Sequence, residues 1–126
     1  MSRNIILILT FGFLLNSCSL FNQNDFLSTE YIGQIGNEKF FYSVFQTGFD
    51  NYRIEFKVAD NKNTTKIFDY YINDAVYTKE RSFKFKVTQD TLIISTRFQS
   101  CKFFYKTKRG TRIELTNDSN PKLCNE

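Results

Sequence analysis

Apolar and polar residues alternate with a period of two along most of the chain beyond residue 30, and no apolar stripe with helical spacing appears. This alternation predicts β-strands that bury one face and expose the other to water. Segment 52–59 shows it most clearly, with Tyr52, Ile54, Phe56 and Val58 on the predicted inner face and Arg53, Glu55 and Lys57 on the outer face.

Polar turn residues divide this pattern into short segments. Gln89-Asp90 joins two alternating runs and predicts a hairpin, and Asp60 to Asn63 is a turn whose side chains can bond the local backbone. Segment 39–47 is apolar on both faces, which predicts a central strand, whereas 73–81 is expected to be a loop or one helical turn. We therefore predict an all-β fold, a single antiparallel meander of seven or eight strands closed as a barrel or sandwich. The predicted strands are 30–35, 39–47, 52–59, 64–72, 82–88, 91–98, 101–107 and 111–116.

The amino end has a different character. Arg3 precedes an apolar run from Ile5 to Leu15, interrupted only by Thr10 and Gly12. As a helix this run would rise roughly 16 Å, about half of a hydrocarbon core, so it is too short to span a bilayer. A charged start, a short apolar run and small polar residues indicate an export signal peptide over residues 1–17.

The run ends in Leu15-Asn16-Ser17-Cys18, which resembles the lipobox of bacterial lipoproteins. The resemblance implies cleavage before Cys18, a diacylglyceryl group on its sulfur and acylation (such as palmitate) of the new amino terminus. Segment 18–29 is then a polar tether and 30–126 the β-domain. Ser19 stands where enteric lipoproteins retained at the inner membrane carry Asp, so the resemblance favours the periplasmic face of the outer membrane.

With Cys18 assigned to lipid, Cys101 and Cys124 remain. An even number of cysteines in an oxidising compartment predicts one disulfide, and two free thiols are the alternative. The bond would tie the polar carboxyl-terminal tail to a strand and contribute roughly 3 kcal/mol through loop entropy.

Several chemistries lack the residues that they need. The sequence has no histidine, so it contains neither a Ser-His-Asp triad nor a closed zinc shell, and no glycine-rich phosphate loop occurs. Asp69 and Asp74 are the nearest pair of carboxylates for glycosidase chemistry, but solvated charges at a strand end are the preferred interpretation. We expect a protein that is not an enzyme and that has no cofactor and no metal.

Charge is distributed unevenly along the chain. Residues 18–78 contain five Lys or Arg and eight Asp or Glu, whereas residues 79–122 contain eleven and four. An outward basic surface would attract lipid phosphates, lipopolysaccharide or an acidic protein, and an ordinary solvated sheet face is the alternative. Nucleic acid is not expected in the envelope. The candidate anion- or partner-binding residues at outward positions are Lys84, Lys86, Arg97, Lys102, Lys106 and Arg112.

These observations favour a non-catalytic interaction module held at the membrane by its lipid. The fifteen phenylalanines and seven tyrosines also leave open a lipocalin-like barrel that carries an apolar ligand. An inhibitor or immunity-type lipoprotein is the third hypothesis, because small anchored β-proteins with one disulfide suit that role.

Overall fold

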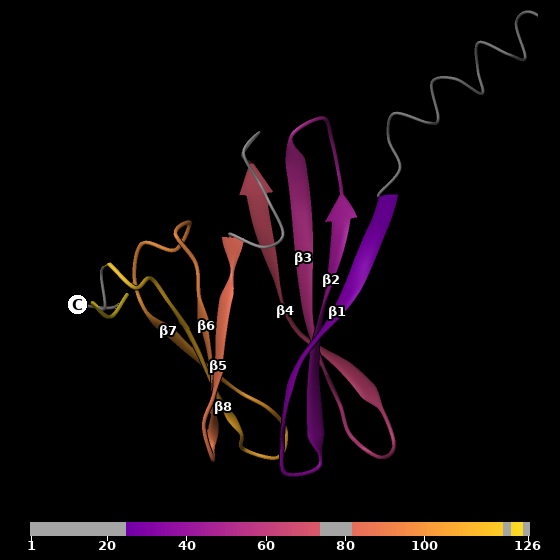
Figure 1. Ribbon diagram of the computed structural model, residues 1–126, viewed down its shortest axis with the longest axis vertical. Helices are drawn as coiled ribbons and strands as arrows, with labels where there is room; N and C mark the ends of the chain where they lie inside the picture. Colours follow the sequence, from indigo (N-terminus) through magenta and orange to yellow (C-terminus); the bar gives the residue numbers. More distant parts are fainter. Residues whose placement is uncertain (1–24, 74–81, 120–121, 125–126) are drawn as a thin grey trace, which may run out of the picture.

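The computed structural model describes residues 25–73, 82–119 and 122–124, which form two β-sheets that face each other (Figure 1). The first sheet is made by the amino-terminal half of the domain and the second by the carboxyl-terminal half. The strands are β1 (Asp25–Ile35), β2 (Glu38–Gln46), β3 (Asn51–Ala59), β4 (Thr64–Asn73), β5 (Lys84–Val87), β6 (Thr91–Ser95), β7 (Phe103–Lys106) and β8 (Arg112–Thr116).

The first sheet is an antiparallel meander in the order β1-β2-β3-β4, as the alternation predicted. Strand β2 lies inside the sheet, which agrees with its two apolar faces. Strand β3 buries Ile54, Phe56 and Val58, so its predicted inner face is confirmed.

Strand β1 begins at Asp25, five residues before the predicted strand, so 25–29 belong to the sheet and not to a tether. Two cross-strand contacts account for the extension. The Phe26 ring packs edge to face on Phe45 at 5.7 Å, and the Thr29 and Ser43 hydroxyls are 2.8 Å apart. Cross-strand side-chain pairs of this kind stabilise the pairing of residues 25–29 with β2, and the polar character of 25–29 alone did not predict it.

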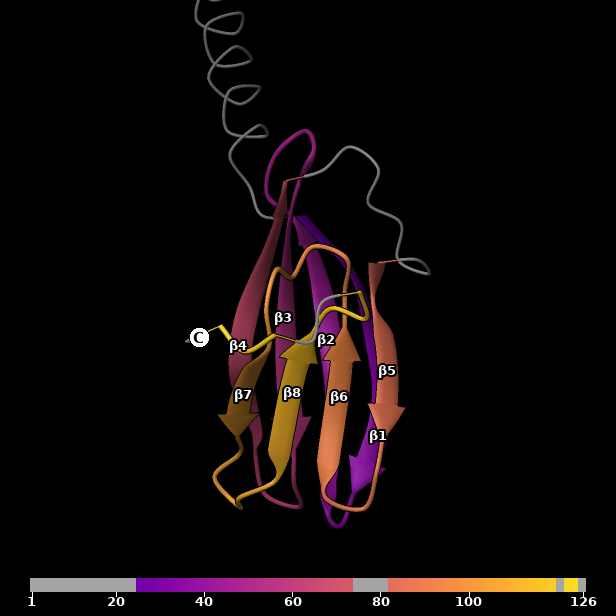
Figure 2. The same cartoon turned by 90° about the vertical axis from the view of Figure 1, so that its left-hand side faces the viewer.

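The second sheet departs from the predicted meander. Its order is β5-β6-β8-β7, and β6 runs parallel to β8 (Figure 2). Residues 96–102 lead from β6 to β7, which is not the neighbour of β6 but the far edge strand of the sheet. β8 then fills the place between β6 and β7. Burial gives a physical reason, because Ile113 and Leu115 of β8 are almost fully buried, whereas Phe103 and Phe104 of the edge strand β7 are exposed.

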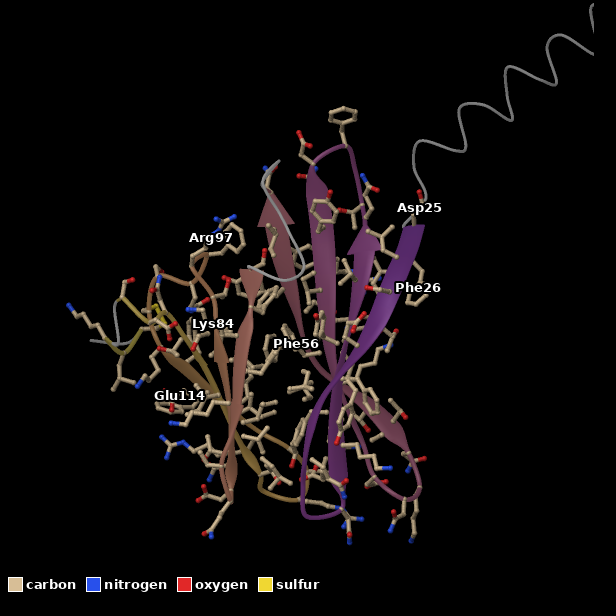
Figure 3. The ribbon with its side chains drawn as sticks, in the orientation of Figure 1. Asp25, Phe26, Phe56, Lys84, Arg97 and Glu114 are labelled. Atoms are coloured by element: carbon tan, nitrogen blue, oxygen red, sulfur yellow. A yellow bond between two sulfur atoms is a disulfide. The ribbon has the colours of Figure 1, made fainter. Side chains whose placement is uncertain are left out.

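Aromatic rings from both sheets fill the space between them (Figure 3). Phe56 lies at the centre, 4.8 Å from the Phe68 ring and 5.5 Å from the Phe83 ring. No hydrogen-bonded ladder joins the two sheets among the described strands, so these strands form no closed barrel. The sheets nevertheless approach closely at β1 and β5, where a Cβ on Gly33 would lie 2.7 Å from Cγ2 of Val87.

Cys101 and Cys124 form the predicted disulfide. The tail runs beside the start of β7, because Lys102 donates its N–H to the Lys122 carbonyl and Cys124 donates to the Lys102 carbonyl. The buried Gln99 joins this region to the first sheet: its Nε2 donates to the Cys101 carbonyl at 2.6 Å, and its Oε1 accepts from the Tyr70 hydroxyl at 3.2 Å. The tail is therefore part of the fold.

Tyr70 makes the stability of the fold dependent on pH above 10. Burial, with a smaller contribution from Tyr105, raises the pKa of Tyr70 from 10.0 to about 12. The unfolded chain releases this proton at lower pH than the folded one, so stability is lost as the pH rises from 10 to 12. Because the phenol is partly exposed, solvent screening reduces the expected loss to about 1 kcal/mol.

We expect Tyr70→Phe to remove this pH-dependent loss, measured by urea unfolding at pH 9 and pH 12. At pH 7 the variant should lose about 1 kcal/mol, because the hydrogen bond to Gln99 is absent. Tyr71→Phe, at an exposed neighbour on β4, is the control and should keep the wild-type pH dependence. Identical pH profiles for Tyr70→Phe and wild type would contradict the prediction.

Candidate functional site

Five of the six predicted cationic residues lie together on the outer surface of the second sheet, which we call the basic face. Strand register brings them together: Lys86 pairs with Ile93, Ile93 with Glu114 and Glu114 with Phe104, while Arg112 pairs with Lys106 in the adjacent row. The five residues are Lys84, Lys86, Lys102, Lys106 and Arg112.

Two acidic side chains neutralise part of this charge. Lys102 forms an ion pair with Glu114 at 2.9 Å, and the exposed Lys84 pairs with Asp118 at 3.5 Å. Within the described residues, no carboxylate lies within ion-pair distance of Lys86, Lys106 or Arg112. The basic face therefore has a net positive charge, and Glu114 lies between Ile93 and Phe104 in its central row; Figure 3 labels Glu114 and Lys84.

An open hollow of about 460 Å³ lies at the β7–β8 side of the basic face, lined by Phe104, Tyr105, Lys106 and Arg112. The Arg112 guanidinium stacks 4.1 Å above the Phe104 ring, which holds the cation in place. Phe104 is 42 % exposed, so the hollow presents an aromatic surface between two cations. This combination suits a carboxylate-bearing ligand with an apolar portion.

Arg97, the sixth predicted residue, does not lie on a strand. β6 ends at Ser95, so the outward strand position expected for Arg97 is wrong, and the residue lies in the connection to β7 with its guanidinium 4.8 Å from the Phe98 ring. It nevertheless lines a second hollow of about 200 Å³ together with Lys84, Asp118 and several hydroxyl side chains. Arg97 thus extends the cationic surface beyond the end of the sheet.

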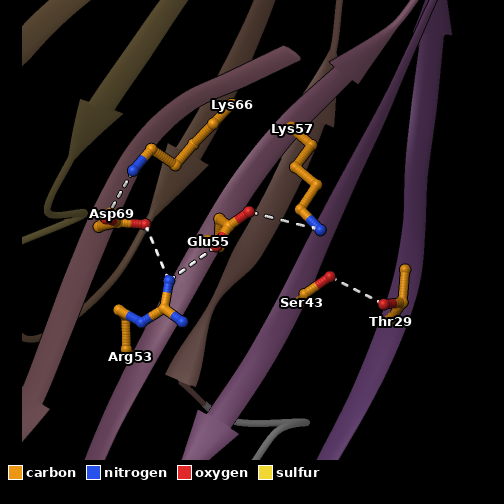
Figure 4. A network of polar contacts seen from close by, with 7 residues as sticks. All are labelled: Thr29, Ser43, Arg53, Glu55, Lys57, Lys66 and Asp69. Carbon is orange, nitrogen blue, oxygen red and sulfur yellow. Dashed lines mark hydrogen bonds and ion pairs between the residues drawn. The ribbon is translucent and has the colours of Figure 1, made fainter. Parts of the chain in front are cut away.

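The outer surface of the first sheet carries a network of ion pairs between three cations and two carboxylates (Figure 4). Arg53 lies 2.7 Å from Glu55 and 3.6 Å from Asp69, and Lys66 lies 3.0 Å from Asp69. Asp69, a candidate for paired-carboxylate chemistry, is therefore held between two cations, although its Oδ1 accepts no hydrogen bond. The other candidate, Asp74, lies outside the described residues.

Glu38 is a buried carboxylate that the sequence analysis did not single out. Its Oε1 accepts hydrogen bonds from the hydroxyls of Thr107 and Thr111, at the two ends of the β7–β8 turn. Glu38 also lines a pocket of about 190 Å³ with apolar residues and with Lys66, Lys106, Lys108 and Arg109. An acidic residue two positions before the apolar run that starts at Phe40 was the available signal.

The turn predicted at Asp60 to Asn63 is confirmed. Oδ1 of Asp60 accepts the backbone N–H groups of Lys62 and Asn63, both at 2.9 Å. These two hydrogen bonds, that from Asn63 first, lower the pKa of Asp60, and Arg109 contributes further. The carboxylate thus serves the turn.

The sequence also raised the questions of a metal site, a membrane-spanning helix and a signal segment. In the described ranges, no group of three His, Cys, Asp or Glu side chains converges as metal ligands. Within the same ranges, no helical segment has both the length and the hydropathy that a membrane span requires. The signal segment 1–17 and Cys18 lie outside the described residues.

Comparisons with protein-family models, curated proteins and solved structures found no match for this chain.

Proposed function

We propose that this protein is a non-catalytic envelope lipoprotein, anchored through lipid on Cys18, whose basic face binds an acidic partner protein. The observation that carries the proposal is the grouping of five cations from three strands and the adjoining chain on one exposed sheet surface. Charge on such a surface accelerates encounter and selects partners of opposite sign. The export signal and the lipobox-like segment support an address at the periplasmic face of the outer membrane.

The composition of the basic face favours a protein partner over a sheet of lipid phosphates. Phe104 and the half-buried Ile93 lie among the cations, and Glu114 lies between them. Protein interfaces combine exposed aromatic residues and arginine with charges of both signs, as the Arg112–Phe104 pair does here. A face specialised for a uniformly anionic surface gains nothing from a central carboxylate.

The two alternative functions have less support. A carrier of an apolar ligand needs an internal cavity, and stacked rings occupy the space between the sheets, such as Phe68 on Tyr105 at 4.5 Å. An inhibitor or immunity role remains compatible with the basic face, because an acidic toxin or hydrolase would be one instance of the proposed partner.

Charge reversal of Lys86 and Lys106 tests the proposal. Both lysines are exposed and have no acidic partner among the described residues, whereas reversing Lys102 would place a second carboxylate beside Glu114. We expect K86E/K106E to weaken binding to poly-L-glutamate at least tenfold, measured by titration at low and physiological salt, and to lose proteins captured by wild type from envelope extract. K39E/K62E is the matched control, because both lysines are exposed and lie off the basic face.

The control variant carries the same change in net charge but leaves the basic face intact, so it should bind within about twofold of wild type. Equal losses in the two variants would reduce the effect to net charge and overturn the proposal. Binding to phosphatidylglycerol vesicles without binding to poly-L-glutamate would assign the basic face to lipid and equally overturn it.

A further inference from the structure

Exposed apolar side chains gather at one end of the domain. Phe49, in the turn between β2 and β3, is 92 % exposed, and Phe26, at the start of β1, is 59 % exposed. Register places both at the same end, because Phe26 pairs with Phe45 and Asp25 with Gln46, directly before that turn. Leu27 and Tyr71 are also exposed there, Tyr71 pairing with Arg53 near the start of β3. We call this end the aromatic end.

The structure holds these rings outward. Thr47 donates its N–H to the Asn51 carbonyl at 2.8 Å, and the Gln46 side chain donates to the Phe49 carbonyl at 3.2 Å, so the turn that carries Phe49 is braced. Phe26 rests edge to face on Phe45, which in turn lies 4.2 Å below the Arg53 guanidinium. Because these rings are already ordered, they lose little conformational entropy when they bind to another surface.

The chain that leads to the lipid site joins the domain at this same end. Strand β1 starts at Asp25, beside Phe26, so the sequence between Cys18 and the sheet meets the domain at this end (Figures 1 and 3). The segment from Cys18 to Phe26 reaches about 28 Å when fully extended, so a lipid on Cys18 would keep the aromatic end close to the bilayer.

We infer that the aromatic end docks on the phospholipid bilayer, with Phe49, Phe26 and Leu27 entering the headgroup region. Aromatic side chains favour that depth. Asp25 and Asp50 flank the rings, and their carboxylates prevent deeper entry. The inference rests on the proposed anchor at Cys18, and it explains why an apolar surface lies where the sequence following Cys18 joins the domain.

Docking at the aromatic end also sets the direction of the basic face. The strands run from this end to the opposite one, and β3 alone covers about 27 Å (Figure 1). On a docked domain the strands stand along the membrane normal, and the outer surface of the second sheet points along the membrane plane. The cations then point parallel to the bilayer surface, toward a neighbouring protein and not into the protein's own bilayer.

Single tryptophan reporters test the docking, since the natural sequence contains no tryptophan. Phe49→Trp places an indole at the aromatic end, and Asn61→Trp places one in the exposed turn at the far end of β3. The mature lipoprotein carrying each change is reconstituted in vesicles of phosphatidylcholine brominated at shallow (6,7) or deep (11,12) acyl positions. We expect the Phe49→Trp indole to be quenched at least twofold, more strongly by shallow bromines, and Asn61→Trp to be unaffected.

Both variants carry the same indole and the same anchor, so quenching caused by either alone would appear equally in both. Equal quenching, or none at Phe49→Trp, overturns the docking inference. Mass spectrometry of the same samples shows separately whether Cys18 carries lipid, so failure of the anchor is distinguished from failure of the docking. Adding K86E/K106E to Phe49→Trp should leave the quenching unchanged, and its loss in that background would also overturn the inference.

Discussion

Phe56→Ala should lower the free energy of unfolding by about 4 kcal/mol, the largest effect that we expect from a single substitution. The side chain is 1 % exposed and its ring contacts aromatic rings on β2, β4 and the start of the second sheet. Removing it leaves a cavity that neither sheet can close, because each side is braced by its own ladder. Urea unfolding followed by circular dichroism measures the change.

Phe49→Ala is the matched control, since it deletes the same atoms from a ring that is almost fully exposed in the absence of membrane. It should change the free energy of unfolding in solution by less than about 0.5 kcal/mol. A domain of this size has only about 5 to 15 kcal/mol of stability, so Phe56→Ala leaves a readily measured unfolded fraction in mild denaturant. Similar losses for the two variants would contradict the assignment of Phe56 to the centre of the core.

Replacing Cys101 and Cys124 together by alanine should cost about 3 kcal/mol. The bond closes a loop with a sequence separation of 23 that contains both β7 and β8, and β8 is an interior strand of its sheet. Loss of the bond therefore raises the conformational entropy of the unfolded chain in the segment that contains β7 and β8, which the second sheet needs. The free energy of unfolding of the double variant should match that of the wild-type protein in reducing agent.

Hydrogen exchange separates this global effect from local release of the tail. Without the bond, the amides of Lys102 and Cys124, which hold the tail beside β7, should exchange at least tenfold faster. The amide of Ile113, in the core strand β8, should follow the global free energy of unfolding. An unchanged unfolding midpoint with faster exchange only in the tail would show that the disulfide secures the tail alone.

Strands β2, β3 and β4 were accessible to sequence reasoning because the apolar pattern of each is local, whereas the extension of β1 to Asp25 was not. Ile54, Phe56 and Val58 occupy the predicted inner face, and β2, apolar on both faces, is an interior strand. The order of the second sheet was not accessible. Alternation in β7 and β8 shows that both are strands, but which of them pairs with β6 depends on burial across the whole sheet.

Some features of the candidate site could also be predicted from the sequence, and others could not. Period-two parity placed Lys84, Lys86, Lys106 and Arg112 on the exposed side of their strands, because the side-chain direction of a strand is a local property, and Lys102 lies one residue before β7. Arg97 was misplaced because β6 ends before it, in a turn where Gln99 donates its N–H to the Thr96 carbonyl. The ion pairs that neutralise Lys84 and Lys102 join residues far apart in sequence and had no local signal.

By itself the sequence predicted the all-β class, the turn at Asp60 to Asn63, the disulfide between Cys101 and Cys124 and the outward parity of the strand cations, because each follows from local periodicity or from counting. Tertiary structure decided that β8 lies between β6 and β7, that Glu38 holds Thr107 and Thr111, and that Phe26 and Phe49 share one end. These features depend on which distant segments bury each other's apolar surface. The observed arrangement removes apolar surface of the whole domain from water, and this cannot be read from any short segment of the sequence.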